Sequence, residues 1–475
     1  MTKLFRYLKK YRKESILAPF FKLIEVAFEL TVPLIVSNII DVGIENGDKG
    51  YIVKRCLLLG LLGILGLCST LVAQYFSAKA SVGFATDIRH ALFSHIGKLS
   101  YSQLDSLGAP TLITRLTGDI NQVQTGTNLT LRLVLRSPFV VFGAVIMAFT
   151  VDAKSSLVFV VAVPALAAVV FAIMLVCIPM YRNVQQKLDG LLSKTRENLL
   201  GTRVVRAFCK EDEEIEDFDA KNKALTEMQT AVGRISAFMN PATFVLINLA
   251  IIALIYIGAL RVDSGAISRG AVVALYNYMS QILVELIKLA NLIISVTKAI
   301  ACGNRIQSVL DIEPATVPGT VTEGDKKCEY SVEFDGACLS YNGSEESLHN
   351  IDLKIPRGST VGVIGSTGSG KSSLVNLIPR FYDVTGGCVL VDGVDVRDYD
   401  TKALRSKIGV VSQKKALFSG SVRDNIRFGK QDATDEEIWQ ALETAQAKQM
   451  IEDKSGQLDF VLEQEGKNLS GGQRQ

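Results

Sequence analysis

Three stretches in the N-terminal half of the chain consist mainly of apolar residues and carry no charge. They run from Cys56 to Ala78, from Ser155 to Tyr181 and from Ile235 to Leu260. A helix of about 20 apolar residues crosses the roughly 30 Å of hydrocarbon in a bilayer, so each stretch is long enough to span a membrane. The chain has 475 residues, of which 48% are hydrophobic, and this composition is too apolar for two ordinary soluble domains. These features predict a helical membrane domain joined to a second part.

Three further apolar stretches contain a few charged residues each, and they run from Ile16 to Ile40, from Leu129 to Val151 and from Gly270 to Ile300. Together with the uncharged stretches they predict six membrane-spanning helices. In an alternative interpretation, the charged stretches are buried helices of a large soluble protein. We disfavour it because the three uncharged spans need partners. An odd number of spans is a further alternative.

Basic residues cluster before the first span, at Lys3, Arg6, Lys9, Lys10, Arg12 and Lys13. Because basic residues are enriched on the cytoplasmic side of membrane proteins, they predict a cytosolic N-terminus, and six spans return the chain to the cytosol. The segments 79–128 and 182–234 are long and retain helical periodicity, so they are expected to continue the spans into the cytosol.

The remaining features of composition say little about partners other than the membrane. The spacing of Leu4, Tyr7, Leu8 and Tyr11 favours an amphipathic helix on the membrane surface. The net charge is only +3, and the basic clusters flank the spans, so nothing supports nucleic-acid binding. The eight cysteines are scattered without a C-x-x-C pair, and their spacing suggests neither disulfides nor a zinc site.

After the last span the composition changes to a Pro- and Gly-containing stretch without periodicity, and strand-like and helix-like segments follow. We expect strands at Val332–Phe334, Ile351–Ile355, Val361–Ile364 and Cys388–Val391, and helices from Lys371 and from Asp435. This order is typical of an α/β nucleotide-binding domain. The predicted organisation is an all-α membrane domain over residues 1–311, a linker over 312–329 and an α/β domain over 330–475.

A phosphate-binding loop follows the third predicted strand. It consists of Gly365, Ser366, Thr367, Gly368, Ser369 and Gly370, and the predicted helix begins with Lys371, Ser372 and Ser373. In such loops, glycine backbone closes around phosphate oxygens and the helix contributes its positive end. We expect Lys371 to hold the β- and γ-phosphates and Ser372 to bind magnesium. A chance glycine-rich turn is the alternative, and the loop alone also fits a kinase, a GTPase or a helicase.

About a hundred residues later the chain reads Leu469, Ser470, Gly471, Gly472 and Gln473. With this sequence, the chain resembles the ATP-binding cassette (ABC) exporters, in particular half-transporters for drugs or lipids, and the resemblance covers nearly the whole chain. It implies that Ser470 to Gln473 of one subunit close over the γ-phosphate on the phosphate loop of another, so that two chains form one functional unit.

The resemblance assigns roles to further residues. It implies that Tyr341 stacks on adenine, with an ordinary strand-end tyrosine as the alternative, and that Gln413, in Val410–Gln413, contacts magnesium and takes part in catalysis with Lys371. Leu417-Phe418 and Asn425-Ile426 follow in the family's order. In the membrane half, Leu112–Asp119 and Glu197–Phe208 resemble cytosolic coupling segments of the family.

One part of the family pattern does not occur in these residues. Family members follow the signature with a helix, an apolar strand that ends in Asp-Glu, and a histidine. None of these follows Gln473, and the apolar run Cys388–Asp392 precedes the signature and enters Asp392-Gly393, which is typical of a hairpin turn. The resemblance therefore predicts a C-terminally truncated nucleotide-binding domain whose signature helix does not form, and ATP hydrolysis by the chain itself stays an open question.

Charged and polar residues within the spans are candidates for a substrate cavity, since they are costly there. On the last span these are Tyr276, Tyr278, Gln281, Glu285, Lys288 and Asn291, and on the first they are Glu25 and Glu29. We expect Tyr278, Gln281 and Glu285 to line the cavity. The alternative is that Lys22 pairs with Glu25, and Glu285 with Lys288, for structural reasons.

The sequence thus predicts half of a dimeric exporter in the cell membrane, with a cytoplasmic nucleotide-binding domain, ATP and Mg²⁺ as cofactors and an amphipathic small molecule, drug or lipid as substrate. The partner is a second half-transporter, identical or different. The alternative function is that of a nucleotide-binding membrane subunit, or an inactive fragment, that pairs with a complete partner and does not hydrolyse ATP.

Overall fold

The structure is a computed structural model, and it describes residues 2–316, 318–325, 327–341, 346–413 and 416–475. The chain divides into two compact units, Met1–Thr316 and Val317–Gln475. The division lies inside the stretch expected to be a linker, 312–329. The later part of this stretch is bonded to the second unit, because Gly319 N donates to Tyr399 O (2.9 Å) and Val321 N to Asp398 O (2.9 Å).

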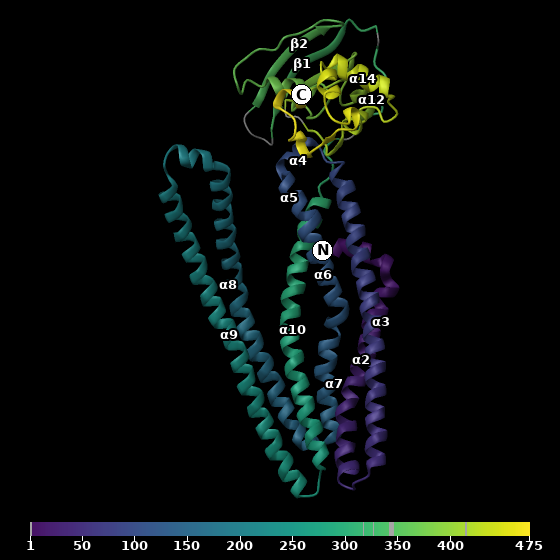
Figure 1. The fold of residues 1–475 in the computed structure, drawn as a ribbon, viewed down its shortest axis with the longest axis vertical. Coiled ribbons are helices and arrows are strands. Elements are labelled where there is room, and N and C mark those ends of the chain that lie inside the picture. The colour runs from purple at the N-terminus through teal and green to yellow at the C-terminus, as the bar shows by residue number, and fades with distance from the viewer. Residues whose placement is uncertain (1, 317, 326, 342–345, 414–415) are drawn as a thin grey trace. The chain divides into compact units, whose positions relative to one another are not determined.

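The first unit is helical, and six helical segments among its described residues are long and apolar enough to cross a membrane, which confirms the predicted number (Figure 1). These segments are Phe5–Ile44, Lys49–Ile96, Ala109–Val151, Ala153–Ala207, Glu211–Asp263 and Arg269–Leu310. The α-helices are α1 (Phe5–Leu8), α2 (Arg12–Asn38), α3 (Lys49–Ile96), α4 (Tyr101–Leu107), α5 (Ala109–Thr114), α6 (Ile120–Leu129), α7 (Arg136–Val151), α8 (Ala153–Ala207), α9 (Glu211–Asp263) and α10 (Arg269–Leu310). Short 3-10 turns at Thr2–Leu4 and Lys9–Tyr11 and π-helical turns at Ile39–Ile44, Arg115–Asp119 and Thr130–Val134 join some of them.

Side-chain caps begin the helices that follow the three short connections. Asp48 accepts a hydrogen bond from Tyr51 N at the start of α3, Asp152 accepts one from Ser155 N at the start of α8, and Ser268 accepts one from Ala271 N at the start of α10. Each cap satisfies a backbone N–H that has no partner within the helix. Short polar residues therefore fix where the chain turns back.

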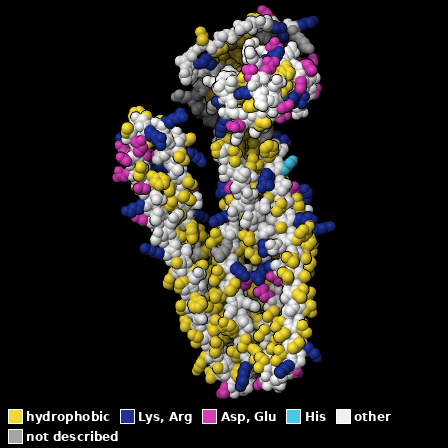
Figure 2. Space-filling view, in the orientation of Figure 1, with side chains coloured by type: hydrophobic (Ala, Val, Ile, Leu, Met, Phe, Trp, Pro, Cys, Tyr) yellow, Lys and Arg dark blue, Asp and Glu magenta, His cyan; other side chains and the backbone are white. Residues whose placement is uncertain are grey.

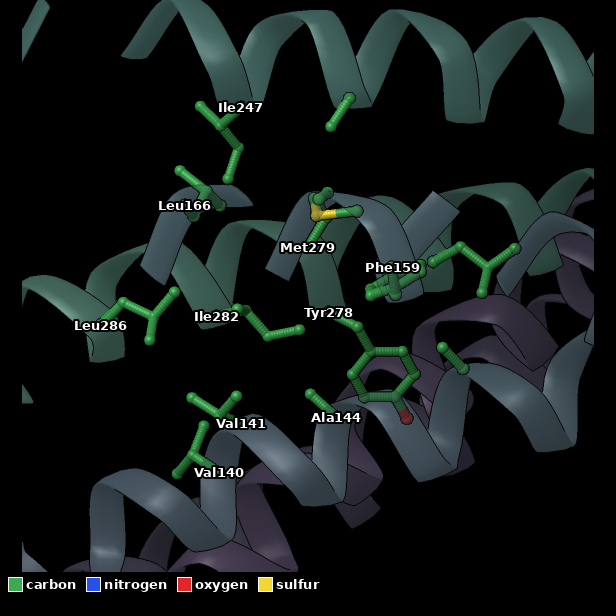
Figure 3. Packing of buried hydrophobic residues seen from close by; sticks show 14 of the residues in the cluster. Val140, Val141, Ala144, Phe159, Leu166, Ile247, Tyr278, Met279, Ile282 and Leu286 are labelled. Carbon is green, nitrogen blue, oxygen red and sulfur yellow. The ribbon is translucent and has the colours of Figure 1, made fainter. Parts of the chain in front are cut away.

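The largest core of the first unit lies between α2, α7, α8, α9 and α10. Figure 3 shows Leu166 and Ile247 on one side of Met279, and Tyr278 beside Ala144 on the other. Tyr278 is fully buried, and its hydroxyl donates to Leu30 O (2.7 Å), so its only polar atom is satisfied. The α8–α9 pair packs on the rest of the unit through this core and diverges from it toward the opposite end of the pair (Figure 1).

A second core joins α3, α5, α6 and α10 to the N-terminal residues. Leu4 is 1% exposed and packs with Phe84 and Ile88 of α3 in this core. The prediction that the N-terminal segment lies on the membrane surface is therefore wrong for Leu4, because protein residues cover its side chain. In Figure 2 apolar side chains cover much of the visible surface of the long helices, as expected for a surface that meets lipid.

The long polar segments do continue the spans as helices, and they turn back over a few residues. Between α3 and α6 the turn contains α4, which Ser100 and Gln103 begin with a reciprocal capping box. Between α8 and α9 it contains Cys209, whose backbone is left-handed (φ 53°). The two segments that resemble coupling segments lie next to these turns: Leu112–Asp119 ends α5 and forms the π-helical turn after it, and Glu197–Phe208 ends α8.

Among its described residues, the second unit contains two antiparallel sheets. The larger has the strand order β2-β1-β3-β4, with β1 (Tyr330–Ser340), β2 (Glu346–Pro356), β3 (Gly386–Val391) and β4 (Val394–Asp395), and the smaller pairs β5 (Gly420–Ser421) with β6 (Val461–Leu462). The helices are α11 (Lys371–Leu377), α12 (Thr401–Ser406), α13 (Val422–Arg427), α14 (Asp435–Thr444), α15 (Lys448–Glu452) and α16 (Gly471–Arg474), with 3-10 turns at Gln457–Asp459 and Gln464–Gly466.

Most predicted elements of this unit are confirmed. β1, β2 and β3 contain Val332–Phe334, Ile351–Ile355 and Cys388–Val391, helices begin at Lys371 and Asp435, and Val391 pairs with Val394 across the Asp392-Gly393 turn, in which both residues have positive φ. The strand predicted at Val361–Ile364 is wrong for the described residues. Its backbone has no strand pairing there, and Ile364 is 97% exposed, because no neighbouring strand covers it.

Candidate nucleotide-binding site

The phosphate loop owes its shape to its glycines. Gly368 (φ 88°) and Gly370 (φ 82°) have left-handed backbone, which glycine adopts without strain. A Cβ atom at Gly370 would also lie 2.7 Å from Ser347 O and 2.8 Å from Leu348 Cδ2. Glycine at position 370 therefore lets β2 lie against the end of the loop and lets α11 begin directly after it.

The amino group of Lys371 is held inside this loop. Its Nζ atom donates to Gly365 O (3.0 Å) and Ser366 O (2.6 Å) and lies 3.4 Å from Ser369 Oγ. The loop carbonyls thus hold a positive charge at the phosphate loop. Ser372 follows on α11 with an exposed side chain, so its hydroxyl can reach a ligand from solvent.

Tyr341 directly follows β1, and the structure brings it to the same helix. Its hydroxyl donates to Ser373 Oγ (2.9 Å), and its ring makes an edge-on contact with the ring of Tyr382, with centroids 5.0 Å apart at 88°. The predicted adenine-stacking residue therefore lies beside the phosphate loop, although 29 positions in the sequence separate Tyr341 from Gly370. Edge-on packing on Tyr382 restricts how the ring of Tyr341 can rotate.

Gln413 lies on an exposed segment in which Val411 is 80% exposed, and among the described residues no hydrogen bond joins its side chain to the phosphate loop. The residues after it are ordered by Asn425, whose side chain accepts from Phe418 N (2.8 Å) and donates to Phe418 O (2.9 Å). At the start of α13, Ser421 and Asp424 form a capping box, and hydrogen bonds from Ser421 lower the pKa of Asp424.

The signature residues form the start of a helix. Ser470 caps α16, because its Oγ accepts from Gln473 N (3.4 Å) while Gln473 Oε1 accepts from Ser470 N (3.0 Å). The prediction that the signature helix does not form is therefore wrong for its first turn, Gly471–Arg474, which this capping box begins. Leu469 is 8% exposed and anchors the turn in the core of α13, α14 and α15, whereas Ser470, Gly471 and Gly472 are exposed.

The charged residues of the membrane-spanning helices form a network around Arg136, which is 8% exposed. Arg136 pairs with Glu285 of α10 and with Glu29 of α2 (2.8 Å), and Glu285 also accepts from Ser137 Oγ (3.1 Å) and pairs with Lys288 (2.9 Å). The predicted pairing of Glu285 with Lys288 is confirmed, and so is that of Lys22 with Glu25.

This network borders a cavity of about 440 Å³ between α2 and α3. Glu25, Glu29 and Arg136 line it on one side, and the leucines and glycines of α3 line it on the other. Figure 2 shows a group of acidic and basic side chains in the middle of the helical unit, surrounded by apolar ones. Charge and apolar surface thus meet in one cavity.

Tyr278, Gln281 and Glu285 were predicted to line a cavity, and the structure differs for two of them. Tyr278 is 0% exposed in the main core, and Glu285 is 3% exposed behind Arg136, because both side chains find partners on neighbouring helices. Gln281 is partly buried, and its Oε1 has no hydrogen-bond partner among the residues that the structure describes. The side chain of Asn291 lies outside the described residues.

Sequence reasoning missed Arg136 as the centre of the network. Arginine inside an apolar stretch is costly without a partner, so the position of Arg136 in the sequence already indicated that it has one. Its two partners, however, are 107 and 149 positions away, and only the packing of α2, α7 and α10 brings them together. The contact of Tyr341 with Tyr382 and Ser373 likewise follows from the fold of the second unit.

Comparison with known proteins gives matches over both units. A family model described as the ABC transporter transmembrane region matches residues 15–286, and a second, described as ABC transporter, matches residues 348–475. The two matches share one chain, in the order predicted from the sequence.

Curated proteins match the chain over nearly its whole length. An uncharacterised ABC transporter ATP-binding protein of Mycobacterium tuberculosis is 36% identical over 99% of this chain and 81% of its own length. A putative multidrug export ATP-binding/permease protein of Bacillus subtilis is 30% identical over 100% of this chain and 83% of its own. An ATP-dependent lipid A-core flippase of Desulfotalea psychrophila is 27% identical over 100% of this chain and 83% of its own.

Proposed function

The chain belongs to the ABC transporter family, as a multi-pass membrane protein of the exporter type with a cytoplasmic ATPase domain, and we propose that it is one half of a dimeric exporter. In this proposal the dimer moves an amphipathic small molecule, drug or lipid outward across the cell membrane, driven by ATP. The observation that carries the proposal is the fusion of six spans to a domain whose Lys371 amino group is held inside a glycine-formed phosphate loop.

The proposed roles in ATP binding follow from this geometry. The carbonyls of Gly365 and Ser366 hold the ammonium of Lys371 at the loop. In the proposed site this ammonium binds the β- and γ-phosphates together with the loop N–H groups. Ser372 has an exposed hydroxyl for Mg²⁺, and Gln413 is free to approach the same ion. Tyr341, braced by Tyr382, offers its ring to adenine.

The exposed signature supports the proposal that two copies, or two related halves, act together. A Cβ atom at Gly471 or Gly472 would meet no atom within 4 Å, so packing within the chain does not require glycine there. Because neither glycine carries a side chain, a phosphate from outside can approach the exposed backbone closely. We infer that this phosphate is the γ-phosphate of ATP on the partner half.

The cavity between α2 and α3 supports an amphipathic substrate. Its α3 wall is apolar, and Glu25, Glu29 and Arg136 place charges of both signs on the opposite wall. An apolar body and a charged head therefore each find a matching surface. The names of two relatives, a lipid A-core flippase and a putative multidrug export protein, are consistent with such a substrate.

A vesicle assay tests this function. The chain is reconstituted in liposomes with a fluorescent-headgroup phospholipid or a cationic amphipathic dye, and movement is measured with and without ATP and Mg²⁺. We expect ATP-dependent movement for the wild-type chain and for the control variant Lys402→Ala, which changes an exposed residue outside the loop, and background movement for Lys371→Ala. Equal movement in Lys371→Ala and wild type would refute the proposal.

A further inference from the structure

We propose that Cys338, Glu346 and His349 form a binding site for a transition-metal dication such as Zn²⁺ on the outer face of the β1–β2 hairpin. One ligand atom from each residue, a thiol sulfur, a carboxylate oxygen and an imidazole nitrogen, lies within 4.8 Å of the other two. The residues come from both strands of the hairpin, so a bound metal would join them.

Two irregularities in strand pairing bring these side chains together. Ala337 pairs with Ile351 and Leu339 with Leu348, so His349 and Asn350 both lie opposite the single residue Cys338. This bulge, in which Asn350 has φ 45°, directs His349 to the face of Cys338.

A second shift brings Glu346 to the same face. Leu339 pairs with Leu348 and Ser340 with Glu346, which leaves Ser347 as an extra residue. In a regular strand, residues three apart such as Glu346 and His349 point to opposite faces. Here the His349 ring nitrogen Nδ1 lies 2.5 Å from Glu346 Oε2, so both side chains lie on the same face of the hairpin.

The three ligands suit zinc in kind and number. Zinc binds thiolate, imidazole and carboxylate, at about 2.3 Å to sulfur and about 2.0 Å to nitrogen, and tetrahedral ligand atoms at these lengths lie about 3.3–3.8 Å apart. His349 Nδ1 and Glu346 Oε2 lie 2.5 Å apart and must separate to this distance, while no pair of ligand atoms is more than 4.8 Å apart. The His349 side chain is 80% exposed, so it has room for the small rotation that this needs. Asn350 N also donates to Cys338 Sγ (3.2 Å), which helps to hold the sulfur in place. Water completes the fourth position.

The place of the site gives it a consequence for nucleotide binding. Cys338 lies three positions before Tyr341, the residue proposed to stack on adenine. In this structure the three ligands approach each other while Tyr341 contacts Ser373 of α11. A metal that joins β1 to β2 therefore stabilises the hairpin that presents Tyr341. The metal site itself rests on Cys338, Glu346 and His349 and does not depend on the proposed transport function.

Zinc binding to the full chain in nanodiscs tests the proposal. Zn²⁺ is titrated against a chromogenic chelator, and Co²⁺ is used as a spectroscopic probe, because a cysteine thiolate ligand gives a charge-transfer band. We expect one Zn²⁺ per chain in the wild type, at least tenfold weaker binding in Cys338→Ser and His349→Gln, and loss of the thiolate band in Cys338→Ser.

The control variant is Cys388→Ser on β3. Burial raises the pKa of the Cys388 thiol, and its sulfur is not part of the cluster, so zinc binding should stay as in the wild type. His349→Gln changes an exposed side chain and should leave the fold intact, so a loss of zinc binding in this variant would not result from unfolding. Equal zinc affinity in wild type and His349→Gln, or absence of zinc binding in the wild type, would overturn the proposal. Neither result bears on the vesicle assay.

Discussion

Tyr341 shows how a single residue of the nucleotide domain is positioned. Its hydroxyl contacts Ser373 and its ring contacts Tyr382, and both of these residues follow the phosphate loop in the chain. Of these two contacts, the ring contact orients the aromatic face and the hydroxyl contact adds a hydrogen bond worth about 1 kcal/mol. The proposed function depends on the ring.

Substitution of Tyr341 separates the two contributions. Stacking on a base is worth about 1–3 kcal/mol, so Tyr341→Ala should weaken ATP binding by about tenfold or more. Tyr341→Phe keeps the ring and loses only the bond to Ser373, and its affinity for ATP should stay within about threefold of the wild type. Equilibrium binding of labelled ATP measures both. Equal affinities in all three proteins would show that Tyr341 does not contact the base.

For single residues, sequence patterns predicted arrangements that depend on neighbours in the chain. They missed contacts between residues that are far apart in the sequence. The glycines and Lys371 of the phosphate loop are contiguous, so their arrangement follows from their order in the chain. Tyr278 was assigned to a cavity because it shares a helical face with polar residues. Its bond to Leu30 O, 248 positions away, is a property of packing.

Among the elements of the membrane domain, the cap at the start of α8 illustrates how one carboxylate joins two helices. Asp152 accepts hydrogen bonds from Ser155 and from Arg261 at the end of α9, at 2.6 Å and 3.3 Å for the arginine. Burial by itself would raise the pKa of Asp152, but the bonds from Arg261 and Ser155 outweigh it and hold the pKa at about 2.

This pKa predicts how stability depends on pH. An unfolded Asp titrates near about 3.9, so the ionised Asp152 stabilises the fold above that pH, and the stabilisation is lost as pH falls from about 4 to about 2. The melting temperature of Asp152→Asn in detergent should lie below that of the wild type at pH 6, and the difference should shrink as pH falls through this range. A difference that is constant with pH would contradict the assignment.

The Arg136 network joins α2, α7 and α10. Removing one partner of a buried ion pair leaves an uncompensated charge, at a cost of about 3–5 kcal/mol. Arg136→Gln should therefore lower the melting temperature markedly, because Glu285 is left buried, and Arg136→Gln with Glu285→Gln should recover most of the loss. Lys288→Gln is the control, since the Lys288 side chain is 48% exposed and its pair should contribute less than about 1 kcal/mol. No recovery in the double variant would mean that the charges do not act as a pair.

Element prediction succeeded where the pattern is long or the pairing is local. The spans were predictable because a long apolar stretch has few alternatives, and the Asp392-Gly393 turn was predictable because both residues tolerate positive φ. The strand prediction for Val361–Ile364 was wrong because a strand needs a neighbouring strand to pair with. The sequence of the segment does not show whether such a neighbour is present. The bulges opposite Cys338 and at Ser347 were not predictable, since they appear only in the pairing of β1 with β2.

At the scale of the whole molecule, the chain joins a membrane region to an ATPase domain of the ABC transporter family, and we propose that it works with a partner half. The two-part organisation was predictable from composition and motif order. The boundary between compact units, after Thr316, was not, because residues 318–325 look like linker in sequence but bond to the second unit.

The proposed approach of the signature to ATP on a partner half can be tested at Gly472. A Cβ atom there meets nothing within 4 Å, and α16 is helical at that point, so Gly472→Ala should leave the melting temperature unchanged. It should nevertheless reduce ATP-dependent movement in the vesicle assay at least tenfold, because in the proposed dimer the methyl group would face the partner's nucleotide. Gly190→Ala on α8, where a Cβ atom is also free of contacts, is the control and should stay active. Full activity of Gly472→Ala would argue against close approach.

The proposed function rests on ATP binding to the phosphate loop, which can be measured by equilibrium binding of labelled ATP to the chain in nanodiscs. Lys371→Ala removes the ammonium that the loop carbonyls hold, and Lys402→Ala removes an exposed charge elsewhere in the same domain. We predict one ATP per chain for the wild type and for Lys402→Ala, and binding at least tenfold weaker for Lys371→Ala. Equal ATP affinity in Lys371→Ala and the wild type would contradict the account.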